Sequence, residues 1–172
     1  YNVTVANLQG AGTLRTRTGN GAQTTTLQSG NFSGSITGAG QLVKTTAGTL
    51  VLTGTNSYTG STTISGGTLQ LGDGGNTGSI DSTSSITNNA ALVFNRSDAV
   101  SFTRAIGGTG SVTQSGSGTL TLSGASTYSG GTTVSGGTLQ VAAASALGSG
   151  GLTMAGGKLA ATSTMTFSKA VG

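Results

Sequence analysis

Apolar side chains recur along the chain in pairs two residues apart, and glycine, serine or threonine separates one pair from the next. Successive side chains of a β-strand point to opposite faces, so two residues at i and i+2 lie on one face of a strand. Helical spacing of i, i+3 and i+4 is absent, and each glycine inside a helix would cost about 1 kcal/mol relative to alanine. The pattern therefore predicts short strands. The pairs are Leu50/Leu52, Leu69/Leu71, Leu92/Phe94, Leu120/Leu122 and Leu139/Val141, with a weaker pair at Leu159/Ala161.

Two further apolar series interleave with these pairs in a constant order. One series contains Leu14, Leu42, Ile64, Ile86, Val112, Val134 and Leu152. The other contains Leu8, Ile36, Tyr58, Ile80, Ile106, Tyr128, Leu147 and Val171. A regular period of this kind is typical of a solenoid, in which each coil here would hold three short strands. We therefore predict an all-β, right-handed parallel β-helix of about seven coils, each of roughly 18–28 residues, with the three series stacked in core columns.

A longer internal sequence repeat spans several of these coils. Residues 32–71 align with residues 102–141 at a constant offset of 70 without gaps, and the final residues FSKAVG resemble FTRAIG at 102–107. We therefore interpret residues 1–172 as a single β-helix segment in which a third copy begins at residue 167. One coil cannot bury its own apolar face, whereas stacked coils form a continuous core, which explains the repetition. Glycine pairs such as Gly66-Gly67 and Gly136-Gly137 are expected at corners between strands.

Two alternatives to this fold follow from the composition. The chain has 33 glycines and only 6% charged residues, against about 25% in ordinary globular domains. Such values also occur in disordered linkers, but linkers lack regularly spaced Leu, Ile, Val and Phe. An antiparallel β-sandwich would need hairpin signals such as Asn-Gly between alternating runs, and only Asn20-Gly21 qualifies. Both alternatives are weaker than the β-helix.

The repeated sequence resembles a known family. GTLVLTGTNSYTGSTTISGGTLQL at 48–71 and GTLTLSGASTYSGGTTVSGGTLQV at 118–141 are similar to the autotransporter-associated β-strand repeat. The resemblance implies the passenger of a bacterial type V secretion protein. Such passengers form right-handed β-helices outside the cell, typically attached to a C-terminal outer-membrane β-barrel. The family repeat has no catalytic residues to transfer to this chain.

Candidate chemistry is sparse in this sequence. The chain has no His and no Cys, which excludes the usual catalytic base and any thiolate metal site. We therefore predict no catalytic, cofactor-binding or metal-binding residues. A glycosidase would need two carboxyl groups within about 5–10 Å of each other, and the registers of Asp73, Asp81 and Asp98 differ. GDGGN at 72–76 resembles a calcium-binding β-roll loop, but such loops recur, and this one occurs once.

Charge adds a candidate contact surface. The formal charge of +4 is spread along the chain, whereas nucleic-acid binding needs a dense basic stripe with aromatics. We expect Arg15 and Arg17 to project from one strand face opposite Leu14, and Arg96 and Arg104 to bracket the insertion NRSDAVSFTR. These charges either keep the rod soluble or contact an anionic glycan or lipopolysaccharide. For Tyr58 and Tyr128, we favour stacking at a corner over ligand binding.

Three functional hypotheses follow. The first is a non-catalytic stalk or adhesion scaffold in an autotransporter passenger, extracellular or on the bacterial surface, anchored to the outer membrane or released. Its partners would be host or bacterial surface molecules. The second is a filament subunit that binds copies of itself by stacking of coil ends, and the third is a glycan-binding or glycan-cleaving β-helix. No run of about 18 apolar residues indicates a transmembrane helix, no signal peptide is visible, and the first residue is Tyr1, so we expect a fragment or processed chain.

Overall fold

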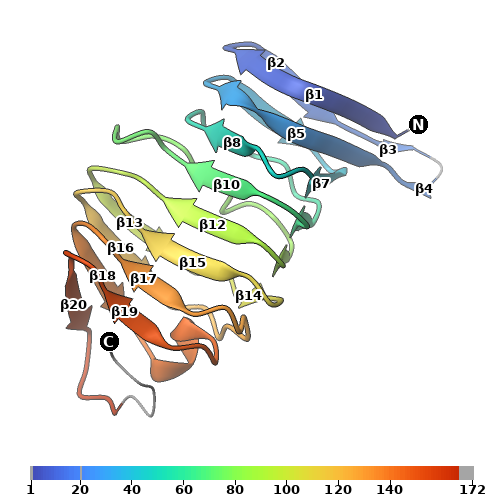
Figure 1. Cartoon of the computed structure of the whole chain (residues 1–172). Coiled ribbons are helices and arrows are strands. Elements are labelled where there is room, and N and C mark those ends of the chain that lie inside the picture. The colour runs from blue at the N-terminus through green and yellow to red at the C-terminus, as the bar shows by residue number, and fades with distance from the viewer. Residues whose placement is uncertain (1, 20, 167–172) are drawn as a thin grey trace.

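A computed structural model describes residues 2–19 and 21–166, and it confirms a parallel β-helix. Eight parallel strands pair side by side along one face of the molecule (Figure 1). They are β1 (Val3–Gly10), β5 (Thr24–Phe32), β8 (Thr49–Leu52), β10 (Thr68–Leu71), β12 (Ala91–Phe94), β15 (Ser111–Gln114), β17 (Thr132–Val134) and β19 (Leu152–Met154). Because each coil adds one strand to this first face, the described residues form eight coils.

The chain forms two other faces in each coil. On the second face the strands β7 (Gln41–Lys44), β9 (Thr62–Ile64), β11 (Ile86–Asn88) and β14 (Ile106–Gly107) stack on the first half of β5. The third strand position of each coil is occupied by β2 (Thr13–Thr16) and β6 (Ser35–Gly38) near the N-terminus. Toward the C-terminus it is occupied by β13 (Ala99–Phe102), β16 (Thr119–Leu122), β18 (Thr138–Val141) and β20 (Lys158–Ala161). The strands β3 (Thr18–Gly19) and β4 (Gly21–Ala22) form a short antiparallel pair, and η1 (Ala144–Leu147) is a 3-10 turn.

A continuous apolar core runs through the coils. Every member of the three sequence series between Ile36 and Leu152 is buried. Leu8 and Leu14, in the first coil, are half-buried and pack against the same core. Val171 and the expected third copy at residue 167 lie outside the described residues. Burial alternates along strands such as β8 and β16, so one face of these strands supplies the core.

The stacking within the core differs from the expected columns. Leu14 pairs with Ile36, not with Leu42. Val112 pairs with Leu92 and Thr132, so it does not follow Ile86. These two differences arise from two strands, β5 and β13, that the series did not contain. They make the coil count eight instead of about seven. In addition, Leu42 and Ile86 both pair with Thr62. Ile64 pairs instead with Lys44 and Asn88, so Ile64 lies two residues out of the expected column.

The two copies of the long repeat keep their internal pairing. Leu42 pairs with Thr62 in the first copy, and Val112 pairs with Thr132 in the second. However, β7 belongs to the second face and β15 to the first. The second copy is therefore turned by one face of the solenoid relative to the first.

Glycines occupy the corners of both copies at matching places. Gly67, between β9 and β10, has φ +67°, and Gly137, between β17 and β18, has φ +53°. A Cβ at Gly67 would collide with the carbonyl oxygen of Thr46, and one at Gly137 with that of Gly118. Only glycine adopts this left-handed backbone at low cost, so the predicted corners are confirmed.

Candidate functional site

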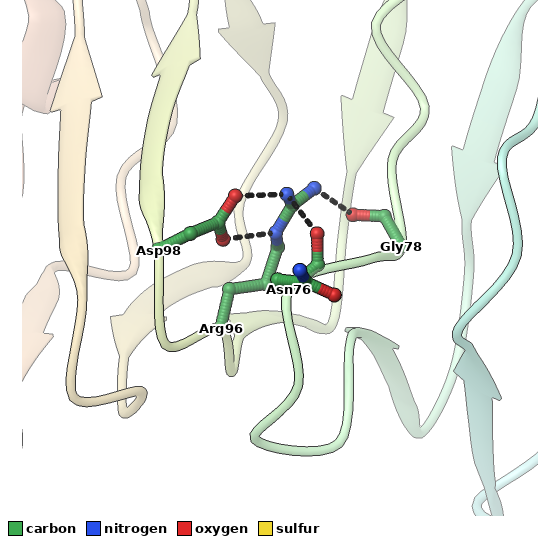
Figure 2. Close-up of polar contacts among 4 residues, drawn as sticks. All are labelled: Asn76, Gly78, Arg96 and Asp98. Atoms are coloured by element: carbon green, nitrogen blue, oxygen red, sulfur yellow. Dashed lines mark hydrogen bonds and ion pairs between the residues drawn. The ribbon is translucent and has the colours of Figure 1, made fainter.

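Arg96 forms the most connected polar cluster in the described part of the chain. It lies in the corner after β12 and reaches across to the loop that follows β10 (Figure 2). Its Nε donates to Asp98 Oδ1 at 2.9 Å and its Nη2 to Asp98 Oδ2 at 2.6 Å. Its Nη1 donates to the Gly78 carbonyl at 3.0 Å and its Nη2 to the Asn76 carbonyl at 2.6 Å. Arg96 thus fastens the loop of one coil onto the next coil.

The electrostatics of this cluster fit a structural role. The hydrogen bonds from Arg96 hold the pKa of the Asp98 carboxyl below its usual value. Both Asp98 oxygens accept from the same guanidinium, which lowers the basicity of this carboxylate. The bidentate geometry positions the loop.

The other two aspartates lie in different environments. Asp81 is half-buried, its Oδ1 is buried without a hydrogen-bond partner, and burial raises its pKa against the opposing charges of Arg96 and Arg104. Asp73 is exposed and accepts a hydrogen bond from the Gly75 backbone at 3.3 Å. Among the residues that the structure describes, no three His, Cys, Asp or Glu side chains gather where they could hold a metal ion.

The matched tyrosines point into the core. Tyr58 and Tyr128 are both fully buried, and each hydroxyl hydrogen-bonds to a threonine four residues later, Thr62 or Thr132, at 2.6 Å. In the first copy the chain of hydroxyls continues from Thr62 to Thr83 at 3.0 Å. Burial raises the pKa of Tyr58, and it raises that of Tyr128 to about 12. These side chains are inaccessible to a ligand on the surface.

A buried lysine was not among the residues selected from the sequence. The side chain of Lys44 is 1% exposed, and its Nζ donates to the carbonyls of Thr46, at 2.5 Å, and Gly66, at 3.0 Å. Burial lowers its pKa. At the matching position, Gln114 is 2% exposed and its Nε2 donates to the Gly116 carbonyl at 3.0 Å. The i+2 spacing from Leu42 was the signal that Lys44 points inward.

Exposed basic residues line a groove near the N-terminal end. Its volume is about 660 Å³, and it is lined by Arg15, Thr16, Arg17, Gly38, Ala39, Ser57 and Thr59. The lining comes from three successive coils, because β2 pairs with β6 and the backbone at Ser57 and Thr59 hydrogen-bonds to that of Ile36 and Gly38. Arg15 and Arg17 are exposed, on either side of the buried Thr16. The structure thus brings these two predicted side chains together with hydroxyl groups in one concave surface.

Comparison with known proteins yields one family. The sequence model of the passenger-associated-transport-repeat family matches residues 42–71 and again residues 112–141. The matches confirm the resemblance seen in the sequence, and they coincide with the two structural copies. A search of curated proteins and a search of solved structures each gave no match. In the described part of the chain, no helix is long and apolar enough to cross a membrane.

Proposed function

Because the chain carries two passenger-associated-transport repeats on one parallel β-solenoid, we propose that it is a non-catalytic scaffold segment of a bacterial passenger. It is secreted or displayed at the cell surface, where it serves as a stalk that carries adhesive regions away from the cell. The observation that carries this proposal is the unbroken ladder of eight parallel strands over one apolar core.

The arrangement of the coils also supports a role in export. Each coil presents an unpaired strand edge to which the next coil can add, so folding can propagate along the chain. Propagation from the end that emerges first would bias movement of the chain outward. The strict internal pairing of each repeat supplies the same template twice.

Disruption of the coils in the second repeat tests the proposal. Leu120 and Leu139 pair with each other across two coils and are buried. Leu120→Asp together with Leu139→Asp places two unpaired carboxylates in the core, which opposes coil formation. In the full-length protein that contains this segment, we expect a several-fold slower appearance of the chain at the cell surface, measured by accessibility to added protease.

The matched control carries the same charges on the surface. Ser123→Asp and Thr127→Asp change two exposed positions of the same copy and should leave export unchanged. Export of the core variant at the wild-type rate, with its coils shown to be unfolded by circular dichroism, would overturn the role in export.

Assembly into filaments and cleavage of glycans are not part of this proposal. A cleaving site would need two available carboxyls within about 5–10 Å of each other, and both oxygens of Asp98 are engaged by Arg96. Stacking of coil ends between copies stays a prediction, which sedimentation at increasing concentration would test.

A further inference from the structure

We propose that the groove at Arg15 and Arg17 binds an acidic saccharide of about two sugar units, lying along the solenoid axis. The inference does not depend on the role in export. It rests on the composition of the groove, on the spacing of its polar groups, and on an uncharged counterpart in the second copy.

The two guanidinium groups are available to an external anion. Both side chains are exposed, and within the described residues neither forms an ion pair or donates a hydrogen bond to another group. None of the residues that line the groove is acidic. Arginine presents a planar set of donors that fits carboxylate and sulfate oxygens in a bidentate manner. The groove therefore carries two unneutralised positive charges on alternate residues, whose Cα atoms lie about 7 Å apart along an extended backbone.

Hydroxyl groups lie at the other end of the groove. Ser57 and Thr59 are exposed two coils away from the arginines, a separation of about 10 Å along the axis. Between them the floor is open at Gly38, whose φ is +101°. A side chain there would be strained, and its Cβ would collide with the carbonyl oxygen of Thr16. Along the axis, the groove thus presents the two arginines, then exposed backbone at Gly38, then the hydroxyl groups of Ser57 and Thr59. This length suits two sugar rings.

The absence of aromatic lining residues selects the ligand class. Neutral sugars are commonly held by stacking on aromatic rings, and single-stranded nucleic acids need both stacking and many cationic contacts. The groove has no aromatic residue and two charges. Ionic contacts would therefore dominate the affinity, which favours a saccharide that carries carboxylate or sulfate groups.

The second copy presents the same backbone without the charges. Ile86 pairs with Ile106 as Leu14 pairs with Ile36, so Thr87 and Asn89 occupy the places of Arg15 and Arg17. The remaining counterparts are Asn88 for Thr16, Gly108 for Gly38, Thr109 for Ala39, Thr127 for Ser57 and Ser129 for Thr59. Arg15→Thr with Arg17→Asn therefore introduces the two side chains that this fold already carries at the matching positions.

Calorimetric titration of the full chain tests the proposal. The probes are a heparin-derived disaccharide bearing sulfate and carboxylate, a neutral disaccharide of equal length, and inorganic sulfate. We expect the acidic disaccharide to bind at least tenfold more tightly than either of the others. Arg15→Thr/Arg17→Asn should raise its dissociation constant about tenfold or more, as expected for the loss of charge-assisted contacts.

The control removes the same net charge elsewhere. Arg104 and Lys158 are exposed and distant in sequence from the groove, and Arg104→Thr/Lys158→Thr should change the dissociation constant less than twofold. Equal losses in both double variants would mean general attraction to a cationic chain and would overturn the site. Unchanged binding by the groove variant would also overturn it. Sulfate binding as tight as that of the disaccharide would overturn the saccharide assignment.

Discussion

The two repeats, residues 42–71 and residues 112–141, are folded alike but oriented differently. Leu42 pairs with Thr62 as Val112 pairs with Thr132, and Tyr58 hydrogen-bonds to Thr62 as Tyr128 does to Thr132. Yet the first copy begins on the second face of the solenoid and the later copy on the first face. The repeat sequence therefore specifies how one strand follows and covers another, and it leaves the face on which a copy starts undetermined.

The segment between the copies sets the rotation. From β7 to β15 the chain makes ten steps from face to face, because the segments at Tyr58 and Ile80 cover the third face without forming a strand. Without β13 it would make nine steps, which are three complete coils. Arg96 joins the loop before β11 to the corner before β13. The difference between the copies is thus a property of their junction.

The largest effect is expected at Phe102, which lies on β13 and corresponds to Phe32 in the repeat. Phe102 is buried and packs edge-to-face on Phe94, with ring centroids 5.0 Å apart. Phe102→Ala should lower the free energy of unfolding by about 3–5 kcal/mol through the cavity it leaves. Phe32→Ala should cost about 0.5–1.5 kcal/mol less, because no aromatic partner is lost among the described residues.

Urea unfolding of both variants, followed by circular dichroism, measures this difference. Equal losses at Phe102 and Phe32 would mean that the aromatic contact at the junction adds nothing to stability. A larger loss at Phe32 would contradict the interpretation that β13 is an integral part of the core.

The missed strands show where prediction from the sequence stopped. The i and i+2 pairs predicted β8, β10, β12, β16 and β18, and the glycine pairs predicted two corners. β5 was not predicted, because Thr25, which pairs with β7, and Gly30, which pairs with β8, are not apolar. β13 was not predicted, because the charged residues on either side of it, Arg96 and Arg104, indicated a surface insertion. Periodicity identifies a strand only where its inward residues are apolar.

The candidate site was predictable to a similar extent. Arg15 and Arg17 were expected on one strand face, and the structure places both in one groove. Ser57 and Thr59 were not predicted as their neighbours, because Leu14 was assigned to the wrong column and the register between coils was therefore unknown. Two of the acceptors of Arg96 are backbone carbonyls, which leave no signature in the sequence.

A smaller effect is expected at the paired tyrosines. In the first copy Thr62 can donate to Thr83, whose hydroxyl in turn donates to the Gly60 carbonyl at 2.6 Å. Tyr58→Phe therefore leaves Thr62 with a partner and should cost about 0.5–1.5 kcal/mol. Tyr128→Phe leaves the buried Thr132 hydroxyl without a described partner and should cost about 1–3 kcal/mol.

Thermal and urea unfolding at pH 7 would compare the two variants, with Thr83→Val combined with Tyr58→Phe as the control. Removal of the Thr83 hydroxyl leaves the Thr62 hydroxyl without a described partner. The double variant should therefore lose about as much free energy of unfolding as Tyr128→Phe. If Tyr58→Phe alone is the more costly change, the extended chain of hydroxyls does not protect Thr62.

The smallest effect, and the one most specific to charge, concerns Lys44 and its counterpart Gln114. Burial lowers the pKa of Lys44 below its usual 10.5 in the folded chain, so the unfolded chain binds more protons between the two values. The free energy of unfolding should therefore rise with pH through that window. Lys44→Gln removes this dependence and should change stability at pH 7 by less than about 1 kcal/mol, since glutamine already serves this corner in the second copy.

Urea unfolding at pH 7 and pH 9.5 separates charge from packing at this corner. The wild-type chain should gain stability relative to Lys44→Gln as the pH rises, because its buried ammonium loses the proton that burial disfavours. Gln114→Lys should show the converse, destabilisation at pH 7 that shrinks at pH 9.5. Parallel pH profiles for all three proteins would mean that the ammonium is as well solvated by its two carbonyls as by water, and the two corners would then differ in sequence alone.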